Sequence, residues 1–359
     1  MRVLVTGGAG FIGSHVVDDL VHAGHEVRVL DRLHPGAHGG PPSYLRDEVD
    51  YRFVDVADVD AVRAALSGID AVSHQASMVG LGVEFADTTD YAHDNDLGTA
   101  GLLVALHQEG FRGPVVLGSS MVVYGEGRYR CNEHGVVRPG PRPREQLDRG
   151  EFDPRCPACH RDVTSEPVPE DAPPDPRNVY AATKLHQEHL VQIYGREHGS
   201  PVTILRYHNV YGPRMPRDTP YAGVASIFRS ALANGMPPRV FEDGRQQRDF
   251  VHVRDVARVN RMALEHAESE CVLNVASGTP HTVLEMAEAL AAGFGPGAPR
   301  PEVIGGYRLG DVRHVFASTR RARDVLGFVA SVGFEAGMAE LAHADLRDPP
   351  SPPRGSVAA

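Results

Sequence analysis

Lysine is nearly absent from this chain. It occurs only once, as Lys184, and arginine supplies the other 35 of the 36 basic side chains. The composition is rich in alanine, glycine, proline, arginine and valine, as a strongly GC-biased genome would produce. Such a bias replaces lysine by arginine wherever the two are equivalent, and they differ where a compact ammonium group is required. Lys184 is therefore a candidate functional residue.

Other absences exclude several classes of protein. No apolar run approaches the roughly 20 residues of a membrane span, so we expect no membrane partner. The apolar N-terminus has neither a basic region nor a cleavage site, so we expect no signal peptide and a cytoplasmic location. A formal net charge of -11 argues against nucleic acid and anionic membranes as partners. With 359 residues, 42% of them hydrophobic, the chain has room for one large or two small domains.

The first glycines form a pattern typical of dinucleotide binding. An apolar run at residues 2–6 predicts a buried strand, and helical periodicity at residues 14–20 predicts a helix. Between them, one glycine permits a tight turn, one lets the backbone approach a pyrophosphate and one allows close helix packing. The pyrophosphate would then meet the helix N-terminus. The predicted contacts are Gly7, Gly10, Phe11, Ile12 and Gly13.

A carboxylate at the end of the next predicted strand favours NAD as the cofactor. Residues 26–30 predict this strand, and Asp31 follows it, 24 residues after Gly7. A carboxylate at this position binds the adenosine ribose hydroxyls and repels the 2′-phosphate of NADP. Arg32 opposes this inference slightly, since an arginine here can accept a phosphate.

Strand and helix patterns continue to alternate along the chain. Strands predicted at residues 51–54, 71–74 and 115–117 are separated by helical segments. This alternation predicts an α/β fold with a Rossmann-type, doubly wound parallel sheet. Ligands of such sheets gather at the C-terminal ends of the strands. The further residues expected to contact the cofactor are Asp55, Val56, Gln75, Ala76, Asn95, Tyr180, Lys184 and Tyr207.

A tyrosine and the single lysine are spaced for acid–base chemistry. Tyr180 and Lys184 lie four residues apart, so in a helix they share one face. A phenol has an unperturbed pKa near ~10, and a cation one turn away lowers that pKa. The pair is therefore a candidate general base or acid for a sugar or alcohol hydroxyl. Alone, this spacing is weak support, because chance pairs are common on any helix.

Several motifs together resemble the extended short-chain dehydrogenase/reductase family, within its nucleotide-sugar epimerase/dehydratase branch. They lie at residues 6–15, 74–76, 119–125 and 180–184, and two later stretches at 205–214 and 248–256 fit as well. The resemblance covers residues 1 to about 330, except for one insert. It implies that Ser120, Tyr180 and Lys184 form the catalytic set. Tyr180 would take the proton of a sugar 4-hydroxyl while carbon 4 gives hydride to the nicotinamide, Ser120 would bind the same oxygen, and Lys184 would hold the nicotinamide ribose.

The residues after the serine narrow the chemistry that the resemblance implies. Sugar 4,6-dehydratases of this family carry an Asp-Glu pair there, whereas this chain has Met121 and Val122. Two apolar side chains cannot transfer protons, which also weakens a decarboxylase interpretation. Epimerisation at carbon 4 is the expected reaction, and reduction of a 4-keto sugar is the alternative. A relative without catalysis, whose insert docks a partner, is a third hypothesis.

The resemblance implies a nucleotide-diphosphate sugar as substrate and a smaller C-terminal α/β substrate lobe. It also implies a homodimer formed through two long helices, near residues 95–109 and 179–198. Glu242 stands where a glycine is usual in the family, which leaves the local geometry open. The expected substrate contacts are Ser120, Met121, Asn209, Phe241, Arg248, Arg308 and Asp311.

An insert separates the serine from the tyrosine. Their gap is 60 residues, far longer than the family pattern, and residues 127–177 are rich in proline and arginine without periodicity, which predicts a loop. Two chelating pairs within it match a structural zinc site, namely Cys131 with His134 and Cys156 with Cys159. His160 competes for the fourth position, although His134 mirrors the other pair. A redox Cys-x-x-Cys pair is less favoured, because no helix pattern follows it. The insert resembles one in epimerases of deoxysugar nucleotides.

The sequence therefore divides into four parts. Residues 1–126 and 178–212 form the expected NAD-binding domain, and 127–177 form the insert. Residues 213–345 form the expected substrate lobe. Residues 346–359, with four prolines, are expected to form a disordered tail.

Overall fold

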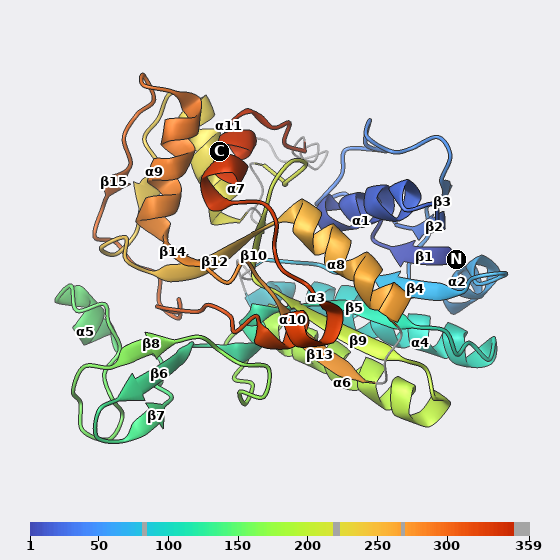
Figure 1. Cartoon of the computed structure of the whole chain (residues 1–359), viewed down its shortest axis with the longest axis horizontal. Coiled ribbons are helices and arrows are strands. Elements are labelled where there is room, and N and C mark those ends of the chain that lie inside the picture. Colours follow the sequence, from blue (N-terminus) through green and yellow to red (C-terminus); the bar gives the residue numbers. More distant parts are fainter. Residues whose placement is uncertain (81–84, 218–222, 267–269, 348–359) are drawn as a thin grey trace.

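A parallel sheet lies at the centre of the molecule in the computed structural model, which describes residues 1–80, 85–217, 223–266 and 270–347 (Figure 1). Its order is β3-β2-β1-β4-β5-β9-β13, so the strand order reverses between β1 and β4. Ligands bind such sheets at this reversal, and the predicted Rossmann-type fold is confirmed. The strands are β1 (Arg2–Thr6), β2 (Glu26–Leu30), β3 (Asp50–Arg52), β4 (Ala71–His74), β5 (Val115–Ser120), β9 (Val202–Tyr207) and β13 (Cys271–Val275).

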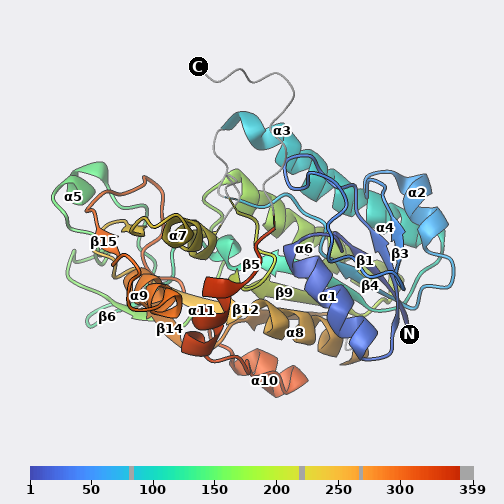
Figure 2. The ribbon, with the colours of Figure 1, turned by 90° about the horizontal axis from the view of Figure 1, so that it is seen from above.

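Helices cover both faces of this sheet (Figure 2). Val3 and Val5 of β1 pack into one apolar cluster and Leu4 into the other, as the period of a strand requires. Because both faces are buried, the strands are continuous apolar runs. One face carries α1 (Phe11–His22), α8 (Val253–His266) and α10 (Arg320–Leu326); the other carries α2 (Val59–Ala65), α4 (Gly98–Gln108) and α6 (Val179–His198). Helix α3 (Thr88–Tyr91) and a π-helical turn (Ala92–Leu97) lead into α4.

A second lobe surrounds its own apolar core. Thr282 begins α9 with a capping box that it forms with Glu285. The strands of this lobe are β10 (Asn209–Tyr211), β12 (Gln247–His252) and β14 (Pro280–Thr282) in one sheet, and β11 (Arg239–Val240) with β15 (Glu302–Val303) in another. Its helices are α7 (Val224–Ala233), α9 (Val283–Phe294) and α11 (Phe334–His343).

The chain crosses between the two lobes more often than the sequence division anticipates. Residues 213–345 contribute β13, α8 and α10 to the central sheet and its covering helices. Their apolar residues have the same pattern whichever core they enter, so sequence alone could not separate them. At the expected tail, Leu346 packs on the core of the second lobe and the Arg347 N–H donates to the Met215 carbonyl oxygen at 2.9 Å. Residues 348–359 lie outside the described residues.

The insert is a folded unit rather than the loop that the sequence predicts. Strands β6 (Arg128–Cys131), β7 (Gly135–Val137) and β8 (Thr164–Glu166) form an antiparallel sheet in the order β7-β6-β8. A short helix, α5 (Arg144–Asp148), lies beside the second lobe (Figure 1). Strands this short carry too little periodicity to be recognised. Across the described ranges, no helix is long and apolar enough to cross a membrane.

Candidate active site

The glycine turn leads into a helix N-terminus that is open to an anion. Gly7 has a φ of +68°, and a Cβ there would lie 2.6 Å from the Ala76 nitrogen. A Cβ on Gly13 would lie 2.1 Å from the Gly7 carbonyl oxygen. Gly10 begins α1, whose first turn has no acidic residue and, within the described chain, no capping side chain. The free N–H groups of this first turn therefore fit a dinucleotide pyrophosphate.

The residues after β2 are arranged for a ribose rather than a phosphate. The Asp31 carboxylate accepts hydrogen bonds from the Ala9 N–H at 3.0 Å and the Leu33 N–H at 2.9 Å. Arg32 forms ion pairs with Asp55 at 2.8 Å and Asp94 at 2.7 Å. Because two carboxylates already neutralise this guanidinium, it is poorly placed to accept the 2′-phosphate of NADP. The residues present fit NAD.

Four other predicted cofactor residues form hydrogen bonds within the protein itself. The Tyr207 hydroxyl donates to the Gln75 side-chain oxygen at 3.0 Å. The Ala76 N–H donates to the Thr6 hydroxyl at 3.1 Å, which fixes the end of β4 beside the glycine turn. Asn95 is fully buried, and its amide bonds Met78 and Thr183. Asn95 therefore holds the loop after β4 against α6. Val56, also predicted as a contact, is buried in the apolar cluster under α2 and α4.

Ser120 and Tyr180 meet at the C-terminal end of the sheet. Asn178 caps α6 by accepting the Ala181 N–H at 2.8 Å, which sets Tyr180 in the first helical turn. Ser120 ends β5, and its hydroxyl accepts the Val122 N–H at 3.3 Å. Burial raises the pKa of Tyr180 to about 12, while a hydrogen bond from Ser120 opposes the rise. The structure thus brings the predicted base and its serine together.

In the structure, the Lys184 ammonium hydrogen-bonds a backbone carbonyl oxygen, and it does not lower the pKa of Tyr180 as the sequence predicted. Lys184 is buried, and its ammonium donates to the Gly118 carbonyl oxygen at 2.9 Å. Burial lowers the pKa of Lys184 to about 7, and Glu188 opposes this change. The spacing of the two residues predicted that Lys184 lowers the Tyr180 pKa, whereas burial raises that pKa. Desolvation of both groups is the physical reason, since it favours the neutral phenol and the neutral amine.

A buried ion pair beneath this site was missed from the sequence. Glu188 follows Lys184 by one helical turn, and Arg206 of β9 donates two hydrogen bonds to it at 2.9 and 2.7 Å. The Ser119 hydroxyl donates to the same carboxylate. Spacing was the available signal, because Tyr180, Lys184 and Glu188 share one helix face. The pair ties the helix that carries the predicted catalytic residues to strands β5 and β9.

Four predicted substrate residues gather in the second lobe. The Arg308 guanidinium lies 5.1 Å from the centre of the Phe241 ring. Arg248 donates to the carbonyl oxygens of Val312 at 2.7 Å and Arg313 at 2.8 Å. Burial raises the pKa of the Asp311 carboxyl, although Arg248 and Arg308 oppose this. These side chains present two guanidinium groups and an aromatic face, a suitable set for a nucleotide diphosphate.

Two further predicted substrate residues, Met121 and Asn209, lie at the ends of strands. Met121 follows Ser120 directly and begins a short 3₁₀ helix, Met121–Tyr124. Asn209 begins β10, beside β12, which carries Arg248. Within the described residues, the buried Asn209 side-chain oxygen has no hydrogen-bond partner. It is therefore an open acceptor.

Two arginines beside the glycine turn were also missed. A terminal nitrogen of Arg347 lies 4.0 Å from the position of a Cβ on Gly10. Arg347 hydrogen-bonds Tyr44, whose hydroxyl donates to the Ala9 carbonyl oxygen at 2.7 Å. Arg214 lies over the same ring, 4.5 Å from its centre. No sequence pattern marks Arg347, because tertiary folding alone brings the C-terminal segment to the turn, whereas Arg214 ends the 205–214 stretch that fits the family.

The insert brings its predicted ligands into one cluster. The ligand atoms of Cys131, His134, Cys156 and Cys159 all lie within 4.8 Å of one another. Individual separations are 3.5 Å from Cys131 to His134, 3.6 Å from Cys131 to Cys159 and 3.6 Å from Cys156 to His134. A tetrahedral zinc with bonds of about 2.0–2.3 Å spaces its ligands by roughly 3.5–3.8 Å, so this set fits the ion. His160 is not part of the cluster.

Comparisons with known proteins extend over nearly the whole chain. Residues 3–276 match the model of the "NAD dependent epimerase/dehydratase family". The chain is 34% identical over 348 residues to a dTDP-L-rhamnose 4-epimerase of Burkholderia thailandensis, covering 95% of this chain and 93% of that protein. It is also similar to the UDP-glucose 4-epimerase of Thermus thermophilus in complex with NAD, with a TM-score of 0.76, 32% identity, and coverage of 95% of this chain and 98% of that one.

A second solved structure is similar along the same length. The UDP-glucose 4-epimerase of Thermotoga maritima with UDP-glucose has a TM-score of 0.76 and 28% identity, covering 95% of this chain and 97% of that chain. The family model spans the glycine turn, the Ser120 strand and the Tyr180 helix that the geometry brings together. The chain therefore belongs to the NAD-dependent epimerase/dehydratase family.

Proposed function

We propose that this chain is an NAD-dependent nucleotide-sugar 4-epimerase. The observation that carries the proposal is the hydrogen-bonded pair of Ser120 and Tyr180, at the sheet edge that also holds the glycine turn. The two positions after Ser120 carry Met121 and Val122, so no second acid–base pair acts on neighbouring carbons. Chemistry confined to carbon 4 agrees with the epimerase names of several relatives.

Each catalytic residue has a defined task in this reaction. Tyr180 removes the proton of the sugar 4-hydroxyl and later returns it, and Ser120 holds the same oxygen through a hydrogen bond. NAD, when bound, supplies a hydride acceptor and a positive charge that favours the phenolate. Lys184 remains fixed by the Gly118 carbonyl oxygen, which places its amine beside the C-terminal end of β5. Rotation of the 4-keto sugar before hydride returns inverts carbon 4.

We further propose a dTDP-deoxysugar, such as dTDP-L-rhamnose, as the substrate. The support is the 34% identity to the Burkholderia thailandensis enzyme along almost the full length of both chains. Phe241, Arg248 and Arg308 would bind the base and the diphosphate. The nucleobase and sugar are open to direct measurement.

The first test is the release of cofactor by denaturing freshly purified protein, followed by incubation with dTDP-L-rhamnose and UDP-glucose without added cofactor. We expect bound NAD, and a product of unchanged mass whose carbon 4 is inverted in its proton NMR spectrum. A protein that is inert until NAD(P)H and a 4-keto sugar are supplied would instead be a ketoreductase.

A matched pair of variants tests the catalytic assignment. Tyr180→Phe removes the proposed base, so we expect kcat to fall by about 10²–10⁴ with NAD content unchanged. Tyr194→Phe on the same helix removes a hydroxyl that donates to the Phe111 carbonyl oxygen at 2.7 Å, and it should retain activity. Biological activity that survives Tyr180→Phe would favour the non-catalytic hypothesis.

A structural zinc ion in the insert is the second part of the proposal. The Cys131, His134, Cys156 and Cys159 cluster supports it through its donor set and spacing. Four protein ligands leave no open position for catalysis. Elemental analysis should find one zinc per chain, and Cys156→Ser should lose it. Because thiolate ligands require reduced cysteines, such a site agrees with a cytoplasmic location.

The exposed sides of α4 and α6 support a homodimer. Leu97, just before α4, and Val104 lie seven residues apart on one face, and Ile193 lies on α6; all three are about half exposed. Sedimentation equilibrium should therefore give a dimer for the wild type and a monomer for Val104→Glu. Ile227→Glu on α7 changes an equally exposed apolar residue and should leave the dimer intact.

A further inference from the structure

Glu242 has a backbone conformation that favours glycine. Its φ is +53°, in the left-handed region that side chains rarely adopt. The Glu242 side chain, which follows Phe241 in the second lobe, is nonetheless only 2% exposed. A strained residue with a buried charge persists only where the surrounding structure holds it. The partners of this carboxylate therefore indicate what it does.

Those partners come from two different parts of the chain. Arg142 of the insert pairs with Glu242 at 2.8 Å, and both side chains are 2% exposed. Arg313, fully buried, pairs with the other oxygen of Glu242 at 2.8 Å. Arg313 follows the segment that carries Arg308 and Asp311. Glu242 thus joins the insert to the proposed nucleotide-binding segment.

Further contacts connect the same two parts. Arg142 donates to the Asp311 carbonyl oxygen at 2.8 Å. Arg313 pairs with Asp153 of the insert at 2.8 Å and with Asp243 at 2.7 Å. The Tyr307 hydroxyl donates to Asp148 of α5. We call the Arg142, Glu242, Arg313 and Asp153 set the insert joint.

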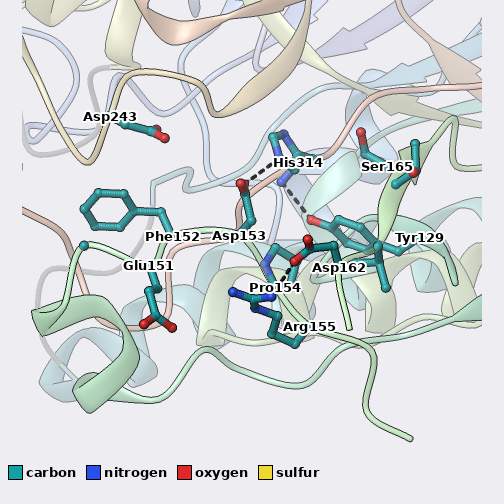
Figure 3. A pocket seen from close by; sticks show the side chains of 13 residues that line it. Tyr129, Glu151, Phe152, Asp153, Pro154, Arg155, Asp162, Ser165, Asp243 and His314 are labelled. Carbon is teal, nitrogen blue, oxygen red and sulfur yellow. Dashed lines mark hydrogen bonds and ion pairs between the residues drawn. The ribbon is translucent and has the colours of Figure 1, made fainter. Parts of the chain in front are cut away.

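A polar cavity of about 450 Å³ lies beside the insert joint (Figure 3). Asp153 and His314 face each other across one wall, and Tyr129 of β6 lies below them. The His314 ring and the Arg313 guanidinium hold the pKa of Asp153 below its usual range. Asp153 therefore stays charged and keeps its pair with Arg313 at neutral pH. On this side the insert joint is exposed to solvent at Asp153, whereas Glu242 on the other side is buried.

Removing Glu242 would leave the guanidinium of Arg142 buried without its carboxylate. A buried charge that loses its partner is costly, so the arginine would turn away or draw in water. Either change releases the Asp311 carbonyl oxygen and frees Phe241, which adjoins Glu242. Arg308, whose guanidinium lies over the Phe241 ring, would move with them.

We propose that Glu242 is a positioning residue for nucleotide-sugar binding. Acting through Arg142 and Arg313, it fixes Phe241, Arg308 and Asp311 in their binding geometry. The insert thereby sets the affinity for the nucleotide diphosphate without touching the reacting carbon. This inference rests on the proposed function, and it gives a reason for a glutamate at a backbone position that favours glycine.

The test measures binding of dTDP and of UDP to the purified NAD-bound protein by calorimetry. The variants are Glu242→Gly, which removes the backbone strain, and Arg142→Ala, which breaks the insert joint from the other side. Both should weaken binding of the preferred nucleotide at least about tenfold, which is 1.4 kcal/mol. Arg149→Ala breaks only the exposed pair with Glu151 on the insert and should bind as wild type does.

Four further tests separate positioning from general damage. NAD content should be unchanged in each variant, and KM for the sugar nucleotide should rise more than kcat falls. Arg142→Lys, which keeps the charge, should restore part of the affinity. Amide hydrogen exchange at residues 306–314 should increase in Arg142→Ala without any ligand, which covers the case in which Glu242→Gly fails to fold.

Two outcomes would overturn the inference in different ways. If the wild-type protein and both variants bind dTDP or UDP equally tightly, the insert joint has no role in binding, and the proposed function still stands. A wild-type protein that binds neither nucleotide would overturn the proposed function, and the role of Glu242 with it.

Discussion

Gly7 and Glu242 both have positive φ angles, of 68° and 53°, for opposite reasons. At Gly7 the missing side chain lets the Ala76 backbone approach, and the turn leads into the uncapped N-terminus of α1. At Glu242 the side chain is the part that matters, since its carboxylate neutralises two buried guanidinium groups. A left-handed residue costs about 1–2 kcal/mol unless it is glycine. At these two positions, the glycine therefore permits close backbone approach, and the glutamate supplies a required side chain.

The largest expected effect comes from removing the central cation of the insert joint. Arg313→Ala leaves Glu242 buried without one of its two partners, and breaking a buried pair costs about 3–5 kcal/mol. Chemical denaturation should show this loss in the free energy of unfolding. Arg323→Ala changes an exposed arginine of α10 and should lose less than about 0.5 kcal/mol. Equal losses in the two variants would contradict the importance of the joint.

The glycine turn offers a test that separates backbone angle from close approach. Gly7→Ala combines a positive φ with a clash against Ala76, so we expect a loss of about 3 kcal/mol and of bound NAD. Gly24→Ala has a φ of +84° but nothing within 4 Å of its Cβ, so it should lose only about 1 kcal/mol. Thermal unfolding and NAD content measure both. If the two variants behave alike, the close approach is irrelevant.

Arg347 tests whether the C-terminal segment completes the glycine turn. Its guanidinium lies beside Gly10 and Tyr44, where it would add positive charge for a pyrophosphate. Arg347→Ala should weaken NAD binding about tenfold, or 1.4 kcal/mol, by equilibrium dialysis. The variant Arg300→Ala alters an exposed arginine of the second lobe and serves as the control. Unchanged NAD binding in Arg347→Ala would remove this residue from the cofactor site.

The smallest expected effect is the pH dependence that Lys184 imposes. Burial lowers its pKa from 10.5 to about 7, so between these values the unfolded chain binds more protons than the folded one. Stability from this group therefore rises with pH above about 7. Wild type should gain about 1 kcal/mol relative to Lys184→Met between about pH 7 and pH 8. A pH profile that is parallel for both proteins would show that the ammonium is not buried.

The sequence predicted the sheet and the family because these depend on local, repeated signals. The apolar strands and the glycine turn are contiguous in the chain, so periodicity and spacing reveal them. The four candidate zinc ligands were also recognised from their spacing. The structure brings these four residues together, and His160 is not among them. Zinc itself stays a prediction, as do the roles of the individual site residues.

Contacts that depend on tertiary folding were not available from the sequence. The short strands of the insert give too little pattern, and the charge pairs of the insert joint combine residues that are up to 160 positions apart, as in Asp153 with Arg313. The Tyr180 pKa was predicted in the wrong direction because sequence shows the adjacent cation but not the burial that dominates. The sequence division placed strand β13 in the substrate lobe for the same reason, because an apolar strand does not show which core it enters.

The single lysine also makes the protein a chemical reporter of its own folding. Apart from the N-terminal amine at Met1, Lys184 offers the only amine in the chain, and it is buried. Acylating reagents should therefore modify folded protein at the N-terminus and reach Lys184 only when α6 separates from β5. Because burial causes the lowered pKa of Lys184, an exposed Lys184 regains its ordinary pKa, and its acylation is best followed at alkaline pH. The rate of that one modification would measure how often the active site opens.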